Sequence, residues 1–195
     1  MEGLISFFPG GGFQAQYLYE YLLVVHPTKD VYNQLQEEKE IFSSQYKVSV
    51  AKKTLPHITV ANFIAKEEME ETIIRYMQKI LSTHQCFEVT LNNYSGFPPH
   101  TVFARVQDHE PFKKLASSLK IIDQYIKSNG CPPAKFITYP HLSIARKLQQ
   151  NVYEKAIFEY AQKTLYASFY VEELVLLKRK NQFDKCKQVN VFRLL

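Results

Sequence analysis

The sequence predicts a fold of two similar lobes, each made of strands and helices, that face each other across a groove. The first observation behind this prediction is a segment that occurs twice, as LPHITVANF at Leu55–Phe63 and as YPHLSIARK at Tyr139–Lys147. The second is the order of elements around each copy, which reads strand, helix, motif strand, helix, strand in both halves. An internal duplication explains both observations, and two similar halves pack naturally as two lobes.

Each copy of the repeated segment has the pattern of a strand with two different faces. Side chains two residues apart point to the same face of a strand, so His57 and Thr59 share a face in the first copy. His141 and Ser143 share a face in the second copy. The aliphatic residues between them point the other way, and we expect them in a core. Each strand therefore presents an imidazole beside a hydroxyl group.

A third His-x-Thr spacing, at His26-Pro27-Thr28, is interpreted as unrelated to the two motifs. Proline donates no backbone hydrogen bond and is not found in the middle of a sheet. We therefore expect Pro27 to end a strand rather than to lie in one.

The elements of the first half follow from local composition and periodicity. Residues 1–16 contain three consecutive glycines and are expected to form a flexible arm. Aromatic and branched residues at Tyr17–Val25 predict a strand, and apolar residues at helical spacing predict two helices. The remaining order is a helix from about Thr28 to Tyr46, the first motif strand, a helix at Lys66–Leu81, a strand at Phe87–Leu91 and a turn-rich connection at 92–99.

The second half repeats this order. The predicted elements are a strand at Thr101–Val106, a helix at Pro111–Lys127, a loop at Gly130–Pro133, the second motif strand, a helix at about Val152–Leu165, a strand at Phe169–Leu177, a hairpin turn near 178–187 and a last strand at Gln188–Leu194. Since neither half contains a Gly/Ser-rich or Pro/Ser-rich linker, we expect residues 1–195 to form a single domain. Lobe one would cover about residues 17–97 and lobe two about 98–195.

Composition indicates a globular protein. Hydrophobic residues make up 46% of the 195 residues, and no apolar run approaches the length of a membrane span. The N-terminus lacks the basic start and long apolar stretch of a secretion signal. Three widely spaced cysteines suggest neither a disulfide framework nor a metal site, so a reducing cytoplasm is the expected location. The sequence leaves the oligomeric state open, and a monomer is the favoured state.

Positive charge is concentrated in the last third of the chain. The net charge is +5, and residues 135–195 contain 11 Lys and Arg against 5 Asp and Glu. This excess suggests an anionic partner near the second motif, although a solvated basic surface has the same composition.

The two motifs suggest phosphoryl-transfer chemistry. Histidine exchanges protons near neutral pH, so one of His57 and His141 can take a proton from an attacking oxygen while the other gives one to the leaving oxygen. The hydroxyls of Thr59 and Ser143 can donate hydrogen bonds to a phosphate between them. Catalysis of this kind depends mainly on positioning and on charge stabilisation.

Two different interpretations of the histidines compete with this one. A metal site is disfavoured, since two histidines without a neighbouring cysteine or carboxylate are too few ligands for zinc. Alternatively, both histidines are ordinary core residues of similar strands. The match between two copies in matching contexts favours a functional pair over that interpretation.

The segments PHITV and PHLSI resemble the paired His-x-Thr/Ser-x signatures of the 2H phosphoesterase superfamily, which includes 2′-5′ RNA ligase-like proteins and cyclic phosphodiesterases. The resemblance covers about residues 17–195. It implies an α+β fold in which two antiparallel sheets line the groove and helices lie outside. It also implies chemistry without a metal or cofactor on 2′,3′-cyclic phosphates or 2′-5′ linkages of RNA ends or nucleotides. His57 and His141 would be catalytic, and Thr59 and Ser143 would bind the phosphate.

Two further residues are weaker candidates for substrate contacts. Tyr139 lies two residues before His141, on the catalytic face, where it can stack on a base or pack against the groove wall. Arg146 follows the second motif as a basic residue often does in these relatives, but strand alternation points it away from His141, toward a surface salt bridge, unless the strand ends before it. Asn62 and Phe63 stand where many relatives have an aromatic-Leu-Gly ending, so the branch of the superfamily stays open.

The leading hypothesis is hydrolysis of a 2′,3′-cyclic phosphate, with one histidine as general base and the other as general acid. If the 5′-hydroxyl of another RNA replaced water, the same groups would perform a 2′-5′ ligation, and basic residues at Lys178–Lys187 would bind the second strand. Two more hypotheses stay open at this point. One is an RNA-binding module with little catalysis, and the other is a phosphodiesterase specific for mononucleotides.

Overall fold

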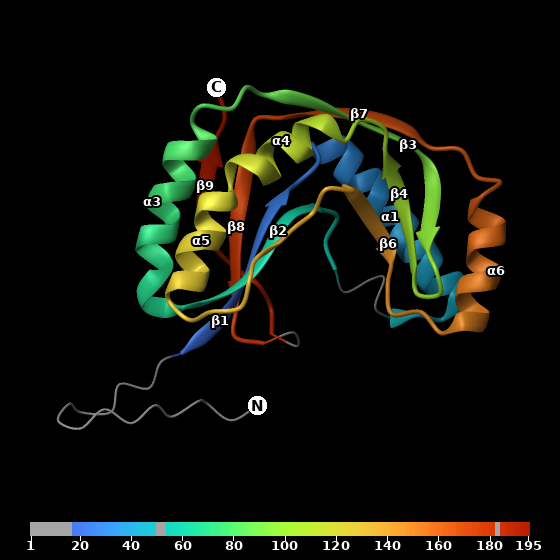
Figure 1. Cartoon of the computed structure of the whole chain (residues 1–195). Coiled ribbons are helices and arrows are strands. Elements are labelled where there is room, and N and C mark those ends of the chain that lie inside the picture. The colour runs from blue at the N-terminus through green and yellow to red at the C-terminus, as the bar shows by residue number, and fades with distance from the viewer. Residues whose placement is uncertain (1–16, 50–53, 182–183) are drawn as a thin grey trace.

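The computed structural model describes residues 17–49, 54–181 and 184–195, so the expected N-terminal arm lies outside the described residues. Helices separate single strands and groups of strands along the chain (Figure 1). The strands are β1 (Leu18–Val25), β2 (Ile58–Lys66), β3 (Phe87–Phe97), β4 (Thr101–Val106), β5 (Lys135–Phe136), β6 (His141–Ala145), β7 (Tyr166–Val171), β8 (Glu173–Arg179) and β9 (Lys187–Arg193). The helices are α1 (Lys29–Tyr46), a 3-10 turn at Glu67–Met69, α3 (Glu70–Leu81), α4 (Glu110–Ser118), α5 (Lys120–Ser128) and α6 (Gln150–Tyr160).

The strands form an antiparallel sheet in the order β7-β3-β4-β6-β2-β1-β8-β9, with β5 paired to β2. This arrangement confirms the predicted α+β class. The expectation of two separate sheets needs correction, because β2 and β6 pair at Ile58 and Leu142 and join all the strands into one sheet. The two motif strands are therefore neighbours at the middle of the sheet.

The sheet has two arms that meet at this pair. Arm one consists of β2, β1, β8 and β9, and arm two consists of β6, β4, β3 and β7. Each arm thus contains strands from both halves of the sequence, which differs from the expected lobes at 17–97 and 98–195. The reason is strand pairing across the two halves of the sequence. Strand β3 forms a hairpin with β4 and so joins arm two, while β8 pairs with β1, which is distant in sequence, in arm one.

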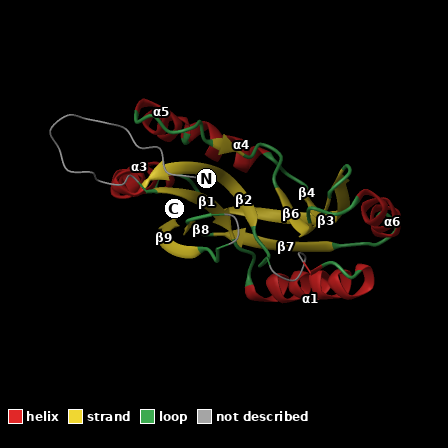
Figure 2. Ribbon diagram, turned by 90° about the horizontal axis from the view of Figure 1, so that it is seen from below, coloured by secondary structure: helices red, strands yellow, loops and turns green. Residues whose placement is uncertain are grey.

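The helices are exchanged between the arms in the same way. Helix α1 from the first half packs against β6 and β7, and α4 from the second half packs against β2. Helix α3 packs against β9, and α6 packs against β3 and β4. In Figure 2, α1 and the α4–α5 pair lie on either side of the strands. Each half of the chain therefore supports the motif strand of the other half.

Three predicted elements differ from the structure. The single strand predicted at Phe169–Leu177 is divided at Glu172 into β7 and β8, which belong to different arms of the sheet. The composition of segment 92–99 predicts a turn, but β3 continues through it to Phe97. Asn93 has a φ of 60° within a register shift, and its side-chain oxygen accepts a hydrogen bond from the backbone N–H of Leu165. The Asn-Asn pair therefore forms a bulge in a long strand, since asparagine tolerates this left-handed conformation. The predicted helix at 111–127 is divided at Leu119 into α4 and α5.

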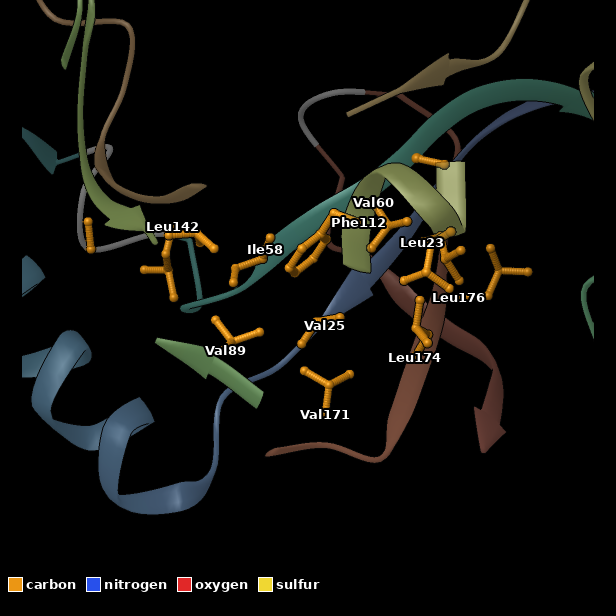
Figure 3. Packing of buried hydrophobic residues seen from close by; sticks show 14 of the residues in the cluster. Leu23, Val25, Ile58, Val60, Val89, Phe112, Leu142, Val171, Leu174 and Leu176 are labelled. Atoms are coloured by element: carbon orange, nitrogen blue, oxygen red, sulfur yellow. The ribbon is translucent and has the colours of Figure 1, made fainter. Parts of the chain in front are cut away.

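The aliphatic residues of the two motifs lie in the core, as alternation predicts. Ile58, Val60 and Leu142 are fully buried, and Figure 3 shows them with Phe112 of α4 in one apolar cluster. This packing holds the motif strands at their positions in the sheet. None of the helices in the described residues is long and apolar enough to cross a membrane.

The contact between β3 and α6 gives a stability prediction. A Cβ atom at Gly96 would lie 2.6 Å from the hydroxyl oxygen of Tyr153 and 2.9 Å from Ile157, both on α6. Gly96→Ala is therefore expected to displace the packed side chains of Tyr153 and Ile157 and to lower the free energy of unfolding by about 1–3 kcal/mol. Urea denaturation measures the change, with Ser95→Ala as the control, expected to change it by about 0.5 kcal/mol or less. Equal stability of the two variants would contradict the close packing of β3 on α6.

Candidate active site

The pairing of β2 with β6 brings the four predicted site residues together. Ile58 pairs with Leu142 in antiparallel register. Continuing that register by one residue in each direction places His57 opposite Ser143 and Thr59 opposite His141. All four are half-buried, whereas Ile58 and Leu142 are fully buried on the other side. Directly opposite residues have Cβ atoms about 5 Å apart, so the two imidazoles and two hydroxyls form one compact group.

Both histidine rings are held in the same way. Nδ1 of His57 lies 2.7 Å from the carbonyl oxygen of Leu55, and Nδ1 of His141 lies 3.0 Å from the carbonyl oxygen of Tyr139. A carbonyl oxygen only accepts, so Nδ1 is the donor in each pair. The proline between each carbonyl and its histidine fixes the backbone angle φ there. Nε2 of each ring is thus the nitrogen left to exchange a proton with a substrate.

The surroundings of the two rings differ in charge. The pKa of His57 is lowered to about 4, mainly by burial; the Leu55 carbonyl acts in the opposite direction, and electrostatic interactions with His26, Lys39 and Arg146 add smaller lowering contributions. Burial also lowers the pKa of His141, with the Tyr139 carbonyl acting in the opposite direction and no cation contributing. Both rings are therefore neutral at pH 7 in the free protein, and His57 is the one held more strongly in that form.

His26 lies beside His57 without repeating its arrangement. The two ring centroids are 6.3 Å apart, and Nδ1 of His26 bonds the carbonyl oxygen of Pro56 at 3.2 Å. Strand β1 ends at Val25, so Pro27 follows the strand as predicted.

Each motif strand has a bulge directly after its hydroxyl residue. The register of β2 with β1 skips Val60, and the register of β6 with β4 skips Ile144. Val60 and Ala61 are consequently both buried, and so are Ile144 and Ala145. A bulge of this kind shifts the alternation by one residue. The next side chain of each strand therefore returns to the catalytic side.

The residues that follow the bulges are Asn62 and Arg146. The alternation that pointed Arg146 away from His141 required a regular strand that continues through Arg146, whereas β6 bulges at Ile144 and ends at Ala145. Arg146 is exposed, its charge acts on His57, and within the described residues it has no ion pair. Asn62 donates a hydrogen bond of 2.7 Å to Glu20, which also accepts one of 2.6 Å from Nε of Arg179.

Aromatic side chains surround His141. The ring centroids of Phe97 and Phe103 lie 4.9 and 5.1 Å from that of His141, and Tyr139 lies 5.7 Å from Phe97. Tyr139 is 44% exposed and Phe97 is 40% exposed, so both offer ring surface to a ligand. The sequence pattern identifies Tyr139 but misses Phe97, because the composition of residues 92–99 favours a turn.

The residues that the structure describes include no group of three or more His, Cys, Asp or Glu side chains placed to hold a metal ion. A cavity of about 440 Å³ adjoins the end of β6. His100, Thr101, Arg146, Lys147 and Leu148 line it.

The resemblance to 2H phosphoesterases led us to expect a His-x-Thr and a His-x-Ser motif on antiparallel strands, and the two motif strands are neighbours in one sheet rather than members of two sheets. A sequence model of the 2′-5′ RNA ligase superfamily matches residues 27–182, which include both motifs. The chain therefore belongs to the 2′-5′ RNA ligase superfamily. No curated protein sequence matches it significantly.

Solved structures share this fold at low sequence identity. Escherichia coli LigT complexed with 3′-AMP is 15% identical with a TM-score of 0.61, over 92% of this chain and 98% of that chain. LigT complexed with ATP is 15% identical with a TM-score of 0.60, over 91% and 98%. The PDE domain of MHV ns2 is 14% identical with a TM-score of 0.50, over 89% and 99%.

Proposed function

We propose that the protein is a metal-independent phosphodiesterase that hydrolyses the 2′,3′-cyclic phosphate of RNA ends or nucleotides. The observation that carries this proposal is the placement of His57 and His141 on neighbouring strands, each opposite a hydroxyl residue. Nε2 of each ring is the nitrogen that can exchange a proton with a substrate. Membership in the superfamily and the likeness to LigT bound to 3′-AMP support a phosphodiesterase or ligase type of enzyme. The three cysteines are free thiols, which is consistent with the proposed cytoplasmic location.

The difference in charge around the rings divides their roles. His57, surrounded by cations, stays neutral and acts as general base, so its Nε2 takes a proton from the attacking water. The water oxygen bonds to phosphorus, and the bond from phosphorus to the ribose 3′ oxygen breaks. His141, without a neighbouring cation, is the ring whose protonated form an anionic phosphate can more readily stabilise, with the proton taken up from solvent. Its Nε2 donates the proton to the leaving oxygen, and the product is a 2′-phosphate.

Thr59 and Ser143 stabilise the phosphate during this step. Their hydroxyls lie on the same face as the two rings and donate hydrogen bonds to the non-bridging oxygens, where charge develops. Arg146 adds positive charge on that side. Tyr139 and Phe97 provide the ring surface on which the base stacks.

The cavity beyond Arg146 favours an RNA end over a mononucleotide as the substrate. Four of its five lining residues carry hydrogen-bond donors, namely His100, Thr101, Arg146 and Lys147, and none carries a carboxylate. A phosphodiester further along the RNA fits such a site. A cyclic mononucleotide should therefore show a lower kcat/KM than a trinucleotide with the same end, and the difference should shrink in high salt. Equal values for both substrates would favour the mononucleotide enzyme.

Ligation through the same site is the second candidate, favoured by the superfamily to which the chain belongs. Two of the basic residues expected to bind a second strand are already paired. Lys178 bonds Glu67 and Glu70 at 2.8 and 2.7 Å, and Arg179 bonds Glu20. The exposed lysines farther along the hairpin remain available for a second strand. Adding an RNA with a free 5′-hydroxyl to the cyclic-phosphate substrate tests ligation, since a 2′-5′-linked product would appear. Binding that survives the loss of either histidine, without turnover, would instead indicate an RNA-binding module.

The rate is expected to have a bell-shaped dependence on pH with its maximum below pH 6.5. As pH falls through about 4, His57 becomes protonated and can no longer act as base. As pH rises, His141 loses the proton that it must donate, and this occurs below the ordinary histidine pKa of 6.5 in the free protein. Values of kcat/KM between about pH 3.5 and 9 report these groups. A rate that rises to a plateau at mildly alkaline pH would contradict the pair, and the fluorescence spectrum checks folding at the acidic end.

A further inference from the structure

Lys39 on α1 is a buried cation behind the two motifs. Its exposed fraction is 1%, and among the described residues it is the one polar or charged side chain classed as buried. Burying an ammonium group carries a large desolvation cost unless it is well bonded. An apolar side chain at this helix position would avoid that cost. The partners of Lys39 therefore show what its presence contributes.

The hydrogen bonds of Lys39 within the described residues go to the motif segments. Its Nζ donates to the hydroxyl of Thr54 at 3.1 Å, to the carbonyl oxygen of Ser143 at 3.0 Å and to that of Ile144 at 3.2 Å. Thr54 lies three residues before His57, and the two carbonyls belong to the bulged part of β6. No carboxylate of the described residues pairs with Lys39.

These bonds reinforce a weak point of the sheet. Within the described residues, β2 and β6 share the single ladder pair of Ile58 and Leu142, so backbone pairing alone holds the motif strands together over a very short length. Lys39 ties the segment that enters the first motif to the strand of the second. It comes from α1, which packs on β6. The position of His57 relative to Ser143 therefore depends on this ammonium group.

We propose that Lys39 is a positioning residue, which fixes the two motif segments relative to each other and places a positive charge behind His57. The proposal concerns the site of the proposed phosphodiesterase and, in its catalytic part, rests on that function. Lys39 is not a catalytic residue, since it is buried and contacts protein groups alone.

The charge of Lys39 complements its hydrogen bonds. The groups that act on His57 are His26 after β1, Lys39 from α1 and Arg146 after β6, and no acidic group is among them. Burial, and then Arg146, lower the pKa of Lys39 to about 8, which still leaves it charged at pH 7. An ammonium fixed at this place favours the neutral form of His57, the form that a general base requires.

The test compares wild type with Lys39→Met, Lys39→Arg and Thr54→Val. NMR titration of the imidazole resonances gives the pKa of His57, and steady-state kinetics on a cyclic-phosphate RNA give kcat and KM. Lys39→Met should raise the pKa of His57 above about 4 and lower kcat about tenfold or more, with little change in KM. Lys39→Arg should keep the pKa of His57 low, and Thr54→Val should lower kcat less and leave that pKa unchanged.

If Lys39 had a purely structural role, its replacement would lower stability. At temperatures well below the melting temperature, it would then change neither the pKa of His57 nor kcat. A folded Lys39→Met protein with both values at the wild-type level would therefore overturn the proposal. If that variant does not fold, Lys39→Gln replaces it, because its amide still donates to a carbonyl while the charge is lost. The titration needs no substrate. If Lys39→Met raises the pKa of His57 while the wild-type protein shows no phosphodiesterase activity, the result supports the positioning role of Lys39 and refutes the proposed function. The two failures are therefore distinguishable.

Discussion

Replacing His57 or His141 by alanine is expected to lower kcat for opening of a 2′,3′-cyclic phosphate at least about a hundredfold, and as much as about 10⁴-fold. Each replacement removes one of the two groups that transfer a proton in the proposed reaction. The two effects should be far from additive, because the base and the acid act in the same step. Single-turnover kinetics of the two single variants and the double variant measure this directly.

His84→Ala is the matched control for the histidine variants. His84 lies in the turn after α3, bonded to the hydroxyl of Ser118 at 3.0 Å, away from the two motifs. Its replacement should leave kcat within about threefold of wild type, because this half-buried residue lies away from the two motifs. If His57→Ala or His141→Ala behaved like this control, the proton-transfer role of that histidine would be refuted.

Removing both hydroxyls of the site is expected to have the second-largest effect. Thr59→Val and Ser143→Ala each remove a donor to the phosphate. Loss of a single donor to a developing negative charge can lower kcat by as much as about 10²–10³-fold. Because the donors act on two different oxygens, the double variant should lose more activity than either single variant. KM should change less than kcat, since these bonds strengthen as the charge develops.

Thr90→Val provides the control for the hydroxyl variants. Thr90 is a half-buried strand residue of β3, and it pairs with Ser168 of β7 in the outer part of arm two. Its replacement should leave kcat unchanged. A double variant of Thr59 and Ser143 with the activity of this control would show that the hydroxyls do not bind the phosphate.

The sequence is sufficient to predict the four central residues because their pattern is local. A strand with alternate aliphatic residues has one face in the core, and the burial of Ile58 and Leu142 confirms this interpretation. The hydroxyl and imidazole positions then follow from a period of two. The duplication also predicts the matching element order in the two halves.

The features that the sequence does not reveal depend on contacts between distant segments. Arg146 returns to the catalytic side because β6 bulges at Ile144 against β4, and a period of two does not anticipate that bulge. Phe97 reaches His141 because β3 continues past Asn93. The repeated ending of the motifs is the one local signal of the two bulges, since each hydroxyl residue is followed by an aliphatic residue and alanine.

Sequence patterns do not identify Lys39 as a buried residue either. Within its helix it resembles one more charged residue in the stretch QEEKE, and its burial arises from the packing of α1 on the opposite arm. The exchange of helices between the arms is set by strand pairing far along the chain. A period of 3.6 identifies the buried face of such a helix but not the strands that it covers.

The most direct test of the central claim follows an RNA oligonucleotide with a terminal 2′,3′-cyclic phosphate by ³¹P NMR in the presence of EDTA. Wild-type protein should open the ring and leave a 2′-phosphate, while protein lacking both His57 and His141 should leave the ring closed. Conversion that stops with EDTA and resumes with added zinc would contradict a metal-independent reaction. Failure of wild type to open the ring would contradict the proposed activity itself.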